Sequence, residues 1–574
     1  MILTSIQNIM WPSNGIPINS FIRGGEYTEE TLFLKKGEEA EFGGYMNCFD
    51  AGLWRRCTNV CFVGIIIKGQ GSFDLTCYHH DRAPAIVLAT TPLKCGEAYW
   101  LKLPEIGQLS LTLRAQNDAV IENIAWMTDL EPHRIKVGLC VTQFHRETEV
   151  TSNLMHFKDL DVTCIVIDNS RSMSPNPNFV VIPNPNLGGA GGFARALSEC
   201  KSRQITHAIF MDDDAATPLE SVRRTLAFLS FANSSQAAVS GAMVSELRPN
   251  ELWENGATFY KRCKPIAHRQ SFGNFNAIYR MLSRQNTHKP YNFYGGWWFF
   301  AFPISAVQSY PFPYFVRGDD ICFSLSNSFQ IEMLPGVFAM QADFAVKESA
   351  FSLYLDLRNH LHHHLVQQSL TLGRVQLAKL AVSFIGRSVF RMHYASARAL
   401  ILAWHDIMAG PSSFSNVENT ISRRNQISDF SGCEKFQSVR EITAPIAQNR
   451  RFNRIFSILS LNGLLIPGFK QWGKVVTIPV HMRGAIWPFA MARKAIIQSS
   501  DQQKSYIVHH NKREAFSIGL SMVWHLLKWL FLFTSVREKH RIGFLELTTS
   551  TFWEKQFLKQ NQRYPIKTRY QNSL

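Results

Sequence analysis

The stretch Ala208-Ile-Phe-Met-Asp-Asp-Asp-Ala215 decides the fold, because an apolar run of strand character ends there in three consecutive carboxylates. Adjacent anions repel one another, so the end of a buried strand is expected to carry three only where a cation shares the site. The simplest such cation is a divalent metal that holds a diphosphate. The alternative is helix capping before Thr217-Pro-Leu-Glu220. A single Asp satisfies a cap, and Asp214 could provide it, which leaves Asp212 and Asp213 for metal or nucleotide binding.

Two apolar runs upstream of this stretch also end in polar residues. Ile135-Lys-Val-Gly-Leu-Cys-Val141 breaks into Thr142-Gln-Phe-His-Arg146, and Val162-Thr-Cys-Ile-Val-Ile167 ends at Asp168. Strands that alternate with helical segments predict an α/β domain with a mostly parallel sheet, whose ligands gather at the carboxyl ends of the strands. The polar residues that follow the two runs are therefore expected at the ligand-binding edge.

Glycines crowd the segment Asn184-Pro-Asn-Leu-Gly-Gly-Ala-Gly-Gly-Phe-Ala-Arg195, which precedes a helix expected to run to about Lys201. Glycine lets the backbone approach a phosphate closely, and a helix N-terminus favours an anion. The segment is not a Walker loop, because the Lys-Ser/Thr pair is missing, and its spacing does not give the Rossmann pattern. Its position shortly before the strand that delivers Asp212 nevertheless predicts phosphate binding.

A tryptophan pair and a second acidic pair follow further along the chain. Tyr294-Gly-Gly-Trp-Trp-Phe-Phe-Ala-Phe-Pro303 places the tryptophans after two glycines, and Tyr314-Phe-Val-Arg-Gly-Asp-Asp-Ile321 contains the acids. The indoles are either core residues or the wall of a sugar site. The acids either cap the next helix or include a general base that deprotonates an acceptor hydroxyl. The two acidic groups lie about a hundred residues apart, so one can bind a cation while the other acts as a base.

Length and composition set the broad class. At 574 residues the chain exceeds what one core usually holds, so two or three domains are expected. A hydrophobic content of 46% with 18% charged residues is typical of a globular protein. The net charge of +16 suits an anionic partner such as acidic lipid or a phosphorylated substrate, and nucleic acid is disfavoured because no recognition motif accompanies it. The N-terminus lacks the features of a secretory signal, and eleven scattered cysteines fit reduced thiols in a cytoplasm.

The regions on either side of the α/β stretch differ from it in pattern. The N-terminal region contains short β-rich runs between turns, which predict an antiparallel β-sandwich. It is either a scaffold or a carbohydrate-binding module, for which Tyr45, Trp54 and Trp100 could offer stacking faces. The C-terminal region shows long helical periods. The expected domains are a β-sandwich at residues 1–132, an α/β domain at 133–365 and a helical domain at 366–574.

Two features of the C-terminal half need an interpretation. The histidines in His360-Leu-His-His-His364 have no nearby Cys or carboxylate that would complete a zinc site, so a solvated or interface face is expected. Phe516 to Ser535 is apolar, but His525 and Lys528 interrupt it and it barely reaches spanning length, which argues against a transmembrane helix. With basic residues behind it, this segment either lies in an anionic membrane interface or forms a core or subunit contact, so a homo-oligomer stays open.

In this order the motifs resemble inverting glycosyltransferases of the GT-A fold, family 2, and above all the galactofuranosyltransferases that build bacterial galactans and O-antigens. The resemblance covers about Glu41 to Asn359. The segments that carry it are Gly43-Gly-Tyr-Met-Asn-Cys-Phe49 with Trp54-Arg-Arg56, Asn186-Leu-Gly-Gly-Ala-Gly-Gly-Phe193, Phe210-Met-Asp-Asp-Asp214, Gly296-Trp-Trp-Phe299, Arg317-Gly-Asp-Asp320 and Arg358-Asn359.

The resemblance implies an N-terminal β-sandwich, a central α/β GT-A domain that binds a nucleotide sugar, and a helical C-terminal region. The implied reaction moves galactofuranose from UDP-galactofuranose onto a lipid-linked or oligosaccharide acceptor at the cytoplasmic face of the membrane, in the synthesis of a cell-envelope polysaccharide. One alternative is a transferase that uses another UDP-sugar. The other is a carbohydrate-binding or assembly scaffold with a decayed catalytic centre.

The resemblance also implies roles for particular residues. Asp212 and Asp214 would hold a divalent metal, Mn²⁺ or Mg²⁺, on the UDP diphosphate. Asp320 would be the catalytic base, with Asp319 beside it. The remaining implied contacts are Thr142, Arg146, Asp168, Asn186, Gly188, Gly189 and Asp213 with the nucleotide sugar, and Trp297 and Trp298 with the acceptor.

The chain departs from the family at two positions. After Leu334-Pro-Gly336 relatives usually carry a His as the third protein ligand, whereas the matching position here is Gln341, whose amide oxygen is a poorer ligand for manganese-like metals. Asp343, two residues on and on the same face of a strand, could replace it. Cys322 stands where an acidic residue often follows the base pair. Gln341 is the main support for the scaffold alternative.

Overall fold

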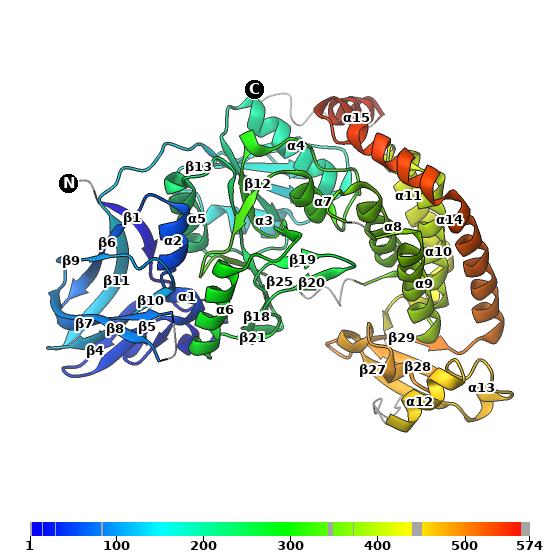
Figure 1. Ribbon diagram of the computed structural model, residues 1–574, viewed down its shortest axis with the longest axis horizontal. Coiled ribbons are helices and arrows are strands. Elements are labelled where there is room, and N and C mark those ends of the chain that lie inside the picture. The colour runs from blue at the N-terminus through cyan, green and yellow to red at the C-terminus, as the bar shows by residue number, and fades with distance from the viewer. Residues whose placement is uncertain are drawn as a thin grey trace.

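The computed structural model describes residues 3–563 apart from 14, 29, 82–83, 343–347, 371 and 439–450. Figure 1 shows three regions in a row: β-sheets at one end, an α/β region in the middle, and mostly helices at the other end. This order follows the order along the chain with one exception. The last helix, α15 (Ser550–Arg563), returns to the middle region and contacts α4 (Gly188–Ser202).

The N-terminal region consists of two antiparallel sheets. The first has the order β3-β4-β11-β6-β9 with β1 beside β11, and its strands are β1 (Thr4–Asn8), β3 (Glu26–Thr28), β4 (Thr31–Leu34), β6 (Phe62–Gln70), β9 (Ala98–Lys102) and β11 (Ala119–Thr128). The second has the order β2-β5-β10-β7-β8, with β2 (Ile22–Arg23), β5 (Glu39–Phe42), β7 (Ser72–His80), β8 (Ile86–Lys94) and β10 (Gln108–Ala115). Along β6, Val63, Ile65 and Ile67 are buried while Ile66 and Lys68 are more exposed, as expected of a sheet with one face on the core.

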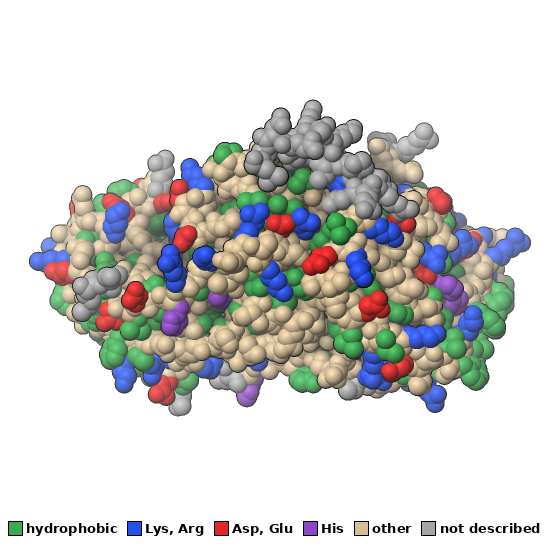
Figure 2. All heavy atoms as spheres, turned by 90° about the horizontal axis from the view of Figure 1, so that it is seen from above, with side chains coloured by type: hydrophobic (Ala, Val, Ile, Leu, Met, Phe, Trp, Pro, Cys, Tyr) green, Lys and Arg blue, Asp and Glu red, His purple; other side chains and the backbone are tan. Residues whose placement is uncertain are grey.

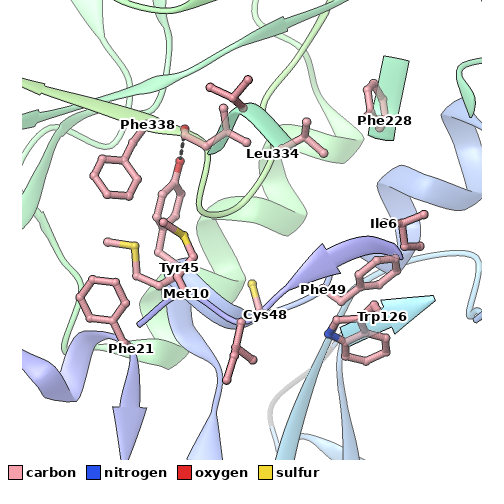
Figure 3. Close-up of a cluster of buried hydrophobic side chains, with 14 of the residues drawn as sticks. Ile6, Met10, Phe21, Tyr45, Cys48, Phe49, Trp126, Phe228, Leu334 and Phe338 are labelled. Atoms are coloured by element: carbon pink, nitrogen blue, oxygen red, sulfur yellow. Dashed lines mark hydrogen bonds between the residues drawn. The ribbon is translucent and has the colours of Figure 1, made fainter. Parts of the chain in front are cut away.

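An apolar core joins these sheets to the middle region, and Figure 3 shows part of it. The short helices at the junction are α1 (Gly44–Asn47) and α2 (Ala51–Cys57). The hydroxyl of Tyr45 donates to Asn255 Oδ1 (2.9 Å) in the middle region, and the Trp54 ring packs edge-on against Phe228 at 5.6 Å between centroids. Tyr45 and Trp54 are 0% and 2% exposed. The idea that these two side chains offer sugar-stacking faces is therefore wrong, because both are core residues.

The middle region is built on a seven-stranded sheet with the order β14-β13-β12-β15-β23-β16-β24. Its strands are β12 (Val137–Gln143), β13 (Val162–Asp168), β14 (Val180–Pro183), β15 (His207–Asp212), β16 (Ala237–Ser240), β23 (Phe300–Pro303) and β24 (Gln330–Glu332). The first four strands in this order run parallel, whereas β23 is antiparallel to both of its neighbours. The prediction of a parallel sheet is thus confirmed for the strands that lead to the three carboxylates.

Helices and two smaller sheets complete the middle region. Its helices besides α4 are α3 (Glu147–Met155), α5 (Leu219–Phe231), α6 (Phe275–Thr287) and α7 (Asp319–Ser326). The four-stranded sheet has the order β21-β18-β17-β25, with β17 (Ala242–Ser245), β18 (Arg248–Glu254), β21 (Gln270–Ser271) and β25 (Phe338–Gln341). The three-stranded sheet has the order β20-β19-β22, with β19 (Ala257–Phe259), β20 (Cys263–Pro265) and β22 (Phe293–Tyr294).

The C-terminal region is not wholly helical, contrary to the prediction for residues 366–574. Its helices are α8 (Ala350–Val366), α9 (Arg374–Phe390), α10 (Tyr394–Ala409), α11 (Val417–Phe430), α12 (Arg451–Leu459), α13 (Phe469–Trp472), α14 (Lys512–Leu547) and α15. A four-stranded sheet lies between α11 and α14, in the order β26-β29-β28-β27, with β26 (Gln437–Ser438), β27 (Lys474–Pro479), β28 (Ala492–Gln498) and β29 (Lys504–His509). The β-branched residues Val475, Val476 and Ile478 favour a strand there.

Helix α14 is, by length and composition, the one helix in the described part of the chain that could cross a membrane. Only 17% of its most apolar stretch of 18 residues is buried. One side of α14 nevertheless packs on α8, α9 and α10. Trp529 Nε1 donates to Arg374 O (2.9 Å), and His540 Nε2 is hydrogen-bonded to Ile407 O (2.8 Å).

Candidate active site

Three strand ends of the seven-stranded sheet meet at one edge. In the register of the sheet, Thr142 on β12 lies beside Asp212 on β15, and Gln143 lies beside Asp168 on β13. Thr142 Oγ1 is buried and has no hydrogen-bond partner among the described residues. A Cβ atom on Gly192 of α4 would lie 2.2 Å from the Thr142 methyl group, so the helix approaches the strand end closely only because that residue is glycine.

The carboxylates at the end of β15 are half-buried and share a cationic neighbour. The Phe144 N–H donates to Asp213 Oδ2 (3.0 Å). Arg146 Nη1 lies 3.3 Å from Asp213 Oδ1 and 2.9 Å from Asp214 Oδ2. The loop that follows β12 therefore supplies a positive charge to the triple of acids.

The glycine segment begins α4 and packs against the loop of the second acidic pair. Gly188 has φ +71°, and a Cβ there would lie 2.1 Å from Phe315 O. A Cβ on Gly189 would lie 3.3 Å from Asp319 Oδ2. Asn186 Oδ1 accepts from the Gly188 N–H (3.1 Å) just before the helix starts. Only a glycine pair allows this close approach, and it brings the helix N-terminus to the acids.

The loop that delivers the second acidic pair is strained. Phe315 and Arg317 have φ values of 76° and 74°, and Gly318 has φ 82°. Residues with a side chain rarely adopt such values, and they persist where the surroundings hold them. A Cβ on Gly318 would also lie 2.6 Å from His363 Nε2 of α8, so the loop rests directly on that helix.

Two buried residues of α8 hold this loop in place. Asn359 Nδ2 donates to Val316 O (3.1 Å) and Arg317 O (2.6 Å), and Arg358 Nη2 donates to Tyr314 O (2.8 Å). Arg358 and Asn359 are almost fully buried, and the bond from Arg358 to Tyr314 O is shielded from water. The Arg358-Asn359 pair noted in the sequence thus positions the acidic loop.

The charges of the two acidic groups, one at Asp212 and the other at Asp319 and Asp320, act on each other. Burial raises the pKa of Asp320 to about 6, against the opposing effects of backbone hydrogen bonds and of Arg317. Burial also raises the pKa of Asp319 well above its usual range, and the negative charges of Asp320 and Asp212 add to the rise. Asp212 is therefore near enough for its charge to act on Asp319. Asp319 and Asp320 occupy the first turn of α7, where a helix favours anions.

Glu254 belongs to the same cluster, although the sequence analysis missed it. It ends β18, is 5% exposed, and its Oε1 has no hydrogen-bond partner among the described residues. Burial, together with the negative charge of Asp320, raises the pKa of Glu254 to about 8. A signal was present, because Glu254 lies two residues after the buried Leu252 and so on the same face of the strand.

Trp297 and Trp298 do not form an acceptor wall in this structure. They are 4% and 5% exposed. The Trp297 ring packs 4.7 Å from the ring of Phe193, and Trp298 Nε1 donates to Gly241 O (2.8 Å). The flanking glycine has a packing role, since a Cβ on Gly296 would lie 2.1 Å from the Trp298 ring. The expectation of sugar contact is corrected to a core role for both side chains.

Asp168 is also occupied within the protein, contrary to the expectation of a nucleotide contact. It is fully buried at the end of β13. Its carboxylate accepts from Gln143 Nε2 (2.5 Å) and from the N–H groups of Arg171 (2.8 Å) and Met173 (2.8 Å). The side chain thus shapes the turn that follows the strand.

The oxygen donors of the cluster fit a divalent cation. Asp212 and Asp319 repel each other, and a cation between them would lower that repulsion. Among the described residues, no three His, Cys, Asp or Glu side chains are already grouped to hold a metal. Gln341 is buried and its Nε2 donates to Met243 Sδ (3.4 Å). Asp343 lies outside the described residues.

The histidine cluster of α8 is buried, so the expected solvated face is wrong. His362, His363 and His364 are each 0% exposed. The Tyr314 hydroxyl lies 2.6 Å from His362 Nδ1 and 3.2 Å from His363 Nδ1. Burial lowers the pKa of His362 and His363 well below the usual value, so both rings are neutral and support the acidic loop.

Comparison with known proteins gives the class to which these features point. No protein-family model matches the chain. A protein of Mycolicibacterium smegmatis is 22% identical over 440 residues, which cover 69% of this chain and 68% of that protein. A protein of Mycobacterium tuberculosis is 21% identical over 477 residues, 74% of each chain. Both are glycosyltransferases, and the similarity supports an enzyme that transfers a sugar.

Both relatives are named galactofuranosyltransferase GlfT2, so the resemblance to galactofuranosyltransferases expected from the motifs is confirmed. Among solved structures, GalNAc-T7 with UDP, GalNAc and Mn²⁺ aligns with a TM-score of 0.29 at 9% identity, over 42% of this chain and 50% of that one. Mannose-1-phosphate geranyltransferase from Thermus thermophilus aligns with a TM-score of 0.21 at 13% identity, over 30% and 58%. Likenesses this low carry no argument about the fold.

Proposed function

We propose that the chain is an inverting, metal-dependent galactofuranosyltransferase. It transfers galactofuranose from UDP-galactofuranose to a hydroxyl of a lipid-linked or oligosaccharide acceptor in the synthesis of a cell-surface glycan such as an O-antigen. The observation that carries the proposal is that α4 packs against both acidic segments: a Cβ on Gly189 would lie 3.3 Å from Asp319 Oδ2, and a Cβ on Gly192 would lie 2.2 Å from the methyl group of Thr142, which pairs with Asp212. The similarity to two galactofuranosyltransferases supports the choice of sugar.

Asp320 is the base in this mechanism. A pKa of about 6 leaves its carboxyl ionised at pH 7 while it still accepts a proton readily. As the acceptor oxygen bonds to the anomeric carbon, the bond from that carbon to the diphosphate breaks and its electron pair leaves with UDP. The acceptor proton passes to Asp320. No general acid is required, in contrast to a glycosidase, because the diphosphate leaves as an anion.

Donor binding falls to the edge formed by α4 and β15. The N–H group at Gly189 and the guanidinium of Arg146 suit an anionic diphosphate, whereas the Gly188 N–H is already bonded to Asn186 Oδ1. A bound Mn²⁺ or Mg²⁺ supplies positive charge to the departing diphosphate, and Asp212 and Asp214 would hold it. Arg146 Nη1 lies 2.9 Å from Asp214 Oδ2, so Asp214 would serve both Arg146 and the metal.

Glu254 supplies a neutral carboxyl beside the base. With a pKa of about 8 it keeps its proton at pH 7, and it can donate a hydrogen bond to Asp320 or to the incoming hydroxyl. Because it is neutral, it also adds no second negative charge that would raise the pKa of Asp320 further. Asp320 as the base and Glu254 as the hydrogen-bond donor are thus two carboxyl groups whose pKa values differ because their surroundings differ.

The test is a screen of UDP-sugars with the product linkage determined by NMR, run on the wild-type chain and on Asp320→Asn. We expect transfer from UDP-galactofuranose with inversion at the anomeric carbon. Asp320→Asn should abolish transfer and leave the affinity for UDP nearly unchanged, because the base acts in the transition state. Turnover like that of the wild type in this variant would exclude Asp320 as the base. Transfer from a different UDP-sugar would correct the donor alone.

A second candidate function is a carbohydrate-binding or assembly scaffold with a decayed metal site. Gln341 favours it, because its amide donates to a sulfur atom instead of presenting its oxygen to a metal. Titration of UDP with and without Mn²⁺ by calorimetry separates the two candidates. Failure of UDP to bind under either condition would support the scaffold.

We also propose that the enzyme works at the cytoplasmic face of a membrane, which α14 contacts without crossing it. Phe516, Leu520, Trp524, Leu527 and Phe531 are exposed at a spacing of three or four residues, so they share one face over about 22 Å. The opposite face is buried against α8, α9 and α10, and lipid cannot surround the helix. In Figure 2 hydrophobic and basic side chains lie side by side at the end of the molecule that carries α14.

Co-sedimentation with phosphatidylglycerol vesicles tests this contact. The double variant Leu520→Glu/Leu527→Glu should lose most of the bound fraction, because it puts two charges on the exposed face of α14. Leu558→Glu, at an exposed leucine of α15, is the matched control and should bind like the wild type. Equal sedimentation of all three proteins would remove α14 from the membrane contact.

A further inference from the structure

The outer face of the first N-terminal sheet carries a groove that the proposed reaction does not use. The groove has a volume of about 520 Å³ and crosses β1, β11 and β6, the strands at the left of Figure 1. Ile66, Ile67 and Lys68 of β6 line it; Ile66 and Lys68 are the more exposed of the three, and Ile67 is fully buried. The groove is also lined by Ser5, Asn8, Asn123 and Met127.

An indole extends this groove onto the next strand. Gly64 of β6 pairs with Met127 of β11 on one side and with Trp100 of β9 on the other. A Cβ at position 64 would lie 3.1 Å from Cε2 and 3.2 Å from Cζ2 of Trp100. The ring therefore lies across the glycine, and Trp100 is only partly buried. Phe62, on the same face of β6, is 52% exposed. From β1 to β9 the surface spans three strand spacings, about 14 Å.

Polar groups at the other side of the groove are fixed by the middle region. Asn123 Nδ2 donates to Asn8 Oδ1 (2.9 Å), and Ser5 Oγ donates to the same oxygen (3.4 Å). Asn8 in turn donates to the buried carboxylate of Glu220 on α5, from its N–H (2.6 Å) and from Nδ2 (3.2 Å). Amide and hydroxyl groups thus stand in set positions beside an apolar floor. Lys68 adds an exposed ammonium group at the margin.

We propose that this face binds a neutral oligosaccharide. A sugar ring has an apolar face of C–H groups and a rim of hydroxyls, which matches a flat indole beside fixed hydrogen-bonding groups. Trp100 stacks on the apolar face, and Asn123 and Ser5 bond to hydroxyls. Tyr45 and Trp54 are buried and cannot act in this way, whereas Trp100 is only half-buried. That the bound saccharide is the acceptor or the product glycan rests on the proposed function. That this surface binds a saccharide does not rest on it.

Binding is tested by saturation-transfer NMR on the full chain with a galactofuranose tetrasaccharide, maltohexaose and xylohexaose, in the presence of UDP. We expect at least one of the three to bind, and Trp100→Ala to weaken that binding at least fivefold. Gly64→Ala should weaken it as well, because the added atom displaces the ring. Trp472→Ala, at an exposed tryptophan of the C-terminal region, is the control and should bind like the wild type. Thermal melts, measured in parallel, report that each variant is folded.

The outcomes separate this inference from the proposed reaction. Saccharide binding that depends on Trp100, found together with no transfer from any UDP-sugar, would support the groove and count against the transferase. Transfer with no saccharide bound would refute saccharide binding by the groove, and so would binding that is unchanged in both Trp100→Ala and Gly64→Ala. Either result would leave the proposed transferase activity unaffected.

Discussion

Replacing Glu254 by Gln tests the pairing of a base with a neutral carboxyl. Activity requires Asp320 without its proton and, in this mechanism, Glu254 with its proton. With pKa values of about 6 and about 8, each group is about 90% in the required form at pH 7. At pH 9 only about 10% of Glu254 keeps its proton, so kcat/KM should fall about tenfold from its value near pH 7. The profile should therefore be bell-shaped.

The variant Glu254→Gln keeps a hydrogen-bond donor that cannot ionise. Its kcat/KM should rise through about pH 6 as in the wild type and then stay level to pH 9. This rise in kcat/KM reports the loss of a proton from the interacting pair Asp319 and Asp320 and not from one residue alone. The assay is release of UDP, with product formation measured in parallel, from pH 5 to 9.5. Glu251→Gln, earlier on the same strand, is the matched control and should keep the bell shape.

An alkaline fall in Glu254→Gln with the same midpoint as in the wild type would refute this assignment. The fall would then come from another group, such as the acceptor or a residue outside the cluster. A loss of activity at every pH would instead show that the carboxyl itself, and not only its hydrogen bond, is needed.

Four further predictions concern the same site. Asp212→Ala should weaken UDP binding at least tenfold in the presence of Mn²⁺ and remove the response to the metal, as measured by calorimetry. Gly188→Ala should destabilise the fold by about 1–3 kcal/mol and weaken UDP binding, since its φ is +71° and a backbone oxygen lies 2.1 Å from the new atom. The control Gly386→Ala has open space around the new atom and should change neither stability nor UDP binding in this way. Asn359→Ala should cost about 1–3 kcal/mol and lower kcat more than UDP affinity, because the strained loop loses two partly buried hydrogen bonds. The pKa of Glu254 in the folded protein, about 8, exceeds its ordinary 4.5, so its protonated carboxyl contributes fully to the stability of the fold below about pH 4.5. This contribution, at most about 5 kcal/mol, is lost as the pH rises through 8. Glu254→Gln should flatten this decline in thermal melts.

The sequence was sufficient where local pattern and topology agree. Apolar runs ending in Thr142, Asp168 and Asp212 predicted parallel strands, and the carboxyl ends of parallel strands share an edge. The glycine segment predicted a helix close behind it, and α4 indeed begins at Gly188, within the glycines. Their packing against the loop of Phe315 and Asp319 was not predicted, because the glycines were assigned to a phosphate. These features depend on backbone geometry, which short stretches of sequence encode.

The sequence was insufficient where the direction of a side chain depends on distant packing. Trp297 and Trp298 looked like a sugar wall because they follow glycines, yet the Trp297 ring packs against Phe193 and Phe210, and Trp298 Nε1 bonds to Gly241 O. Glu254 escaped notice because a carboxyl at a strand end is usually solvated, and its burial depends on elements distant in the chain. The C-terminal sheet was missed because its strands are short and lie between long helices.

The contact of α15 with α4 has a consequence for how the chain matures. Trp553 Nε1 donates to Pro311 O (2.9 Å), and its ring lies where a Cβ on Gly191 would be only 3.2 Å away. Part of the support behind the N-terminus of α4, the proposed diphosphate site, is thus contributed by a segment synthesised some 360 residues after the glycines it supports. During translation the first two regions can pack early, but this end of α4 acquires its support only when Trp553 has emerged from the ribosome. A nascent or truncated chain that ends before α15 should consequently be poor at retaining nucleotide, however well its central sheet is formed.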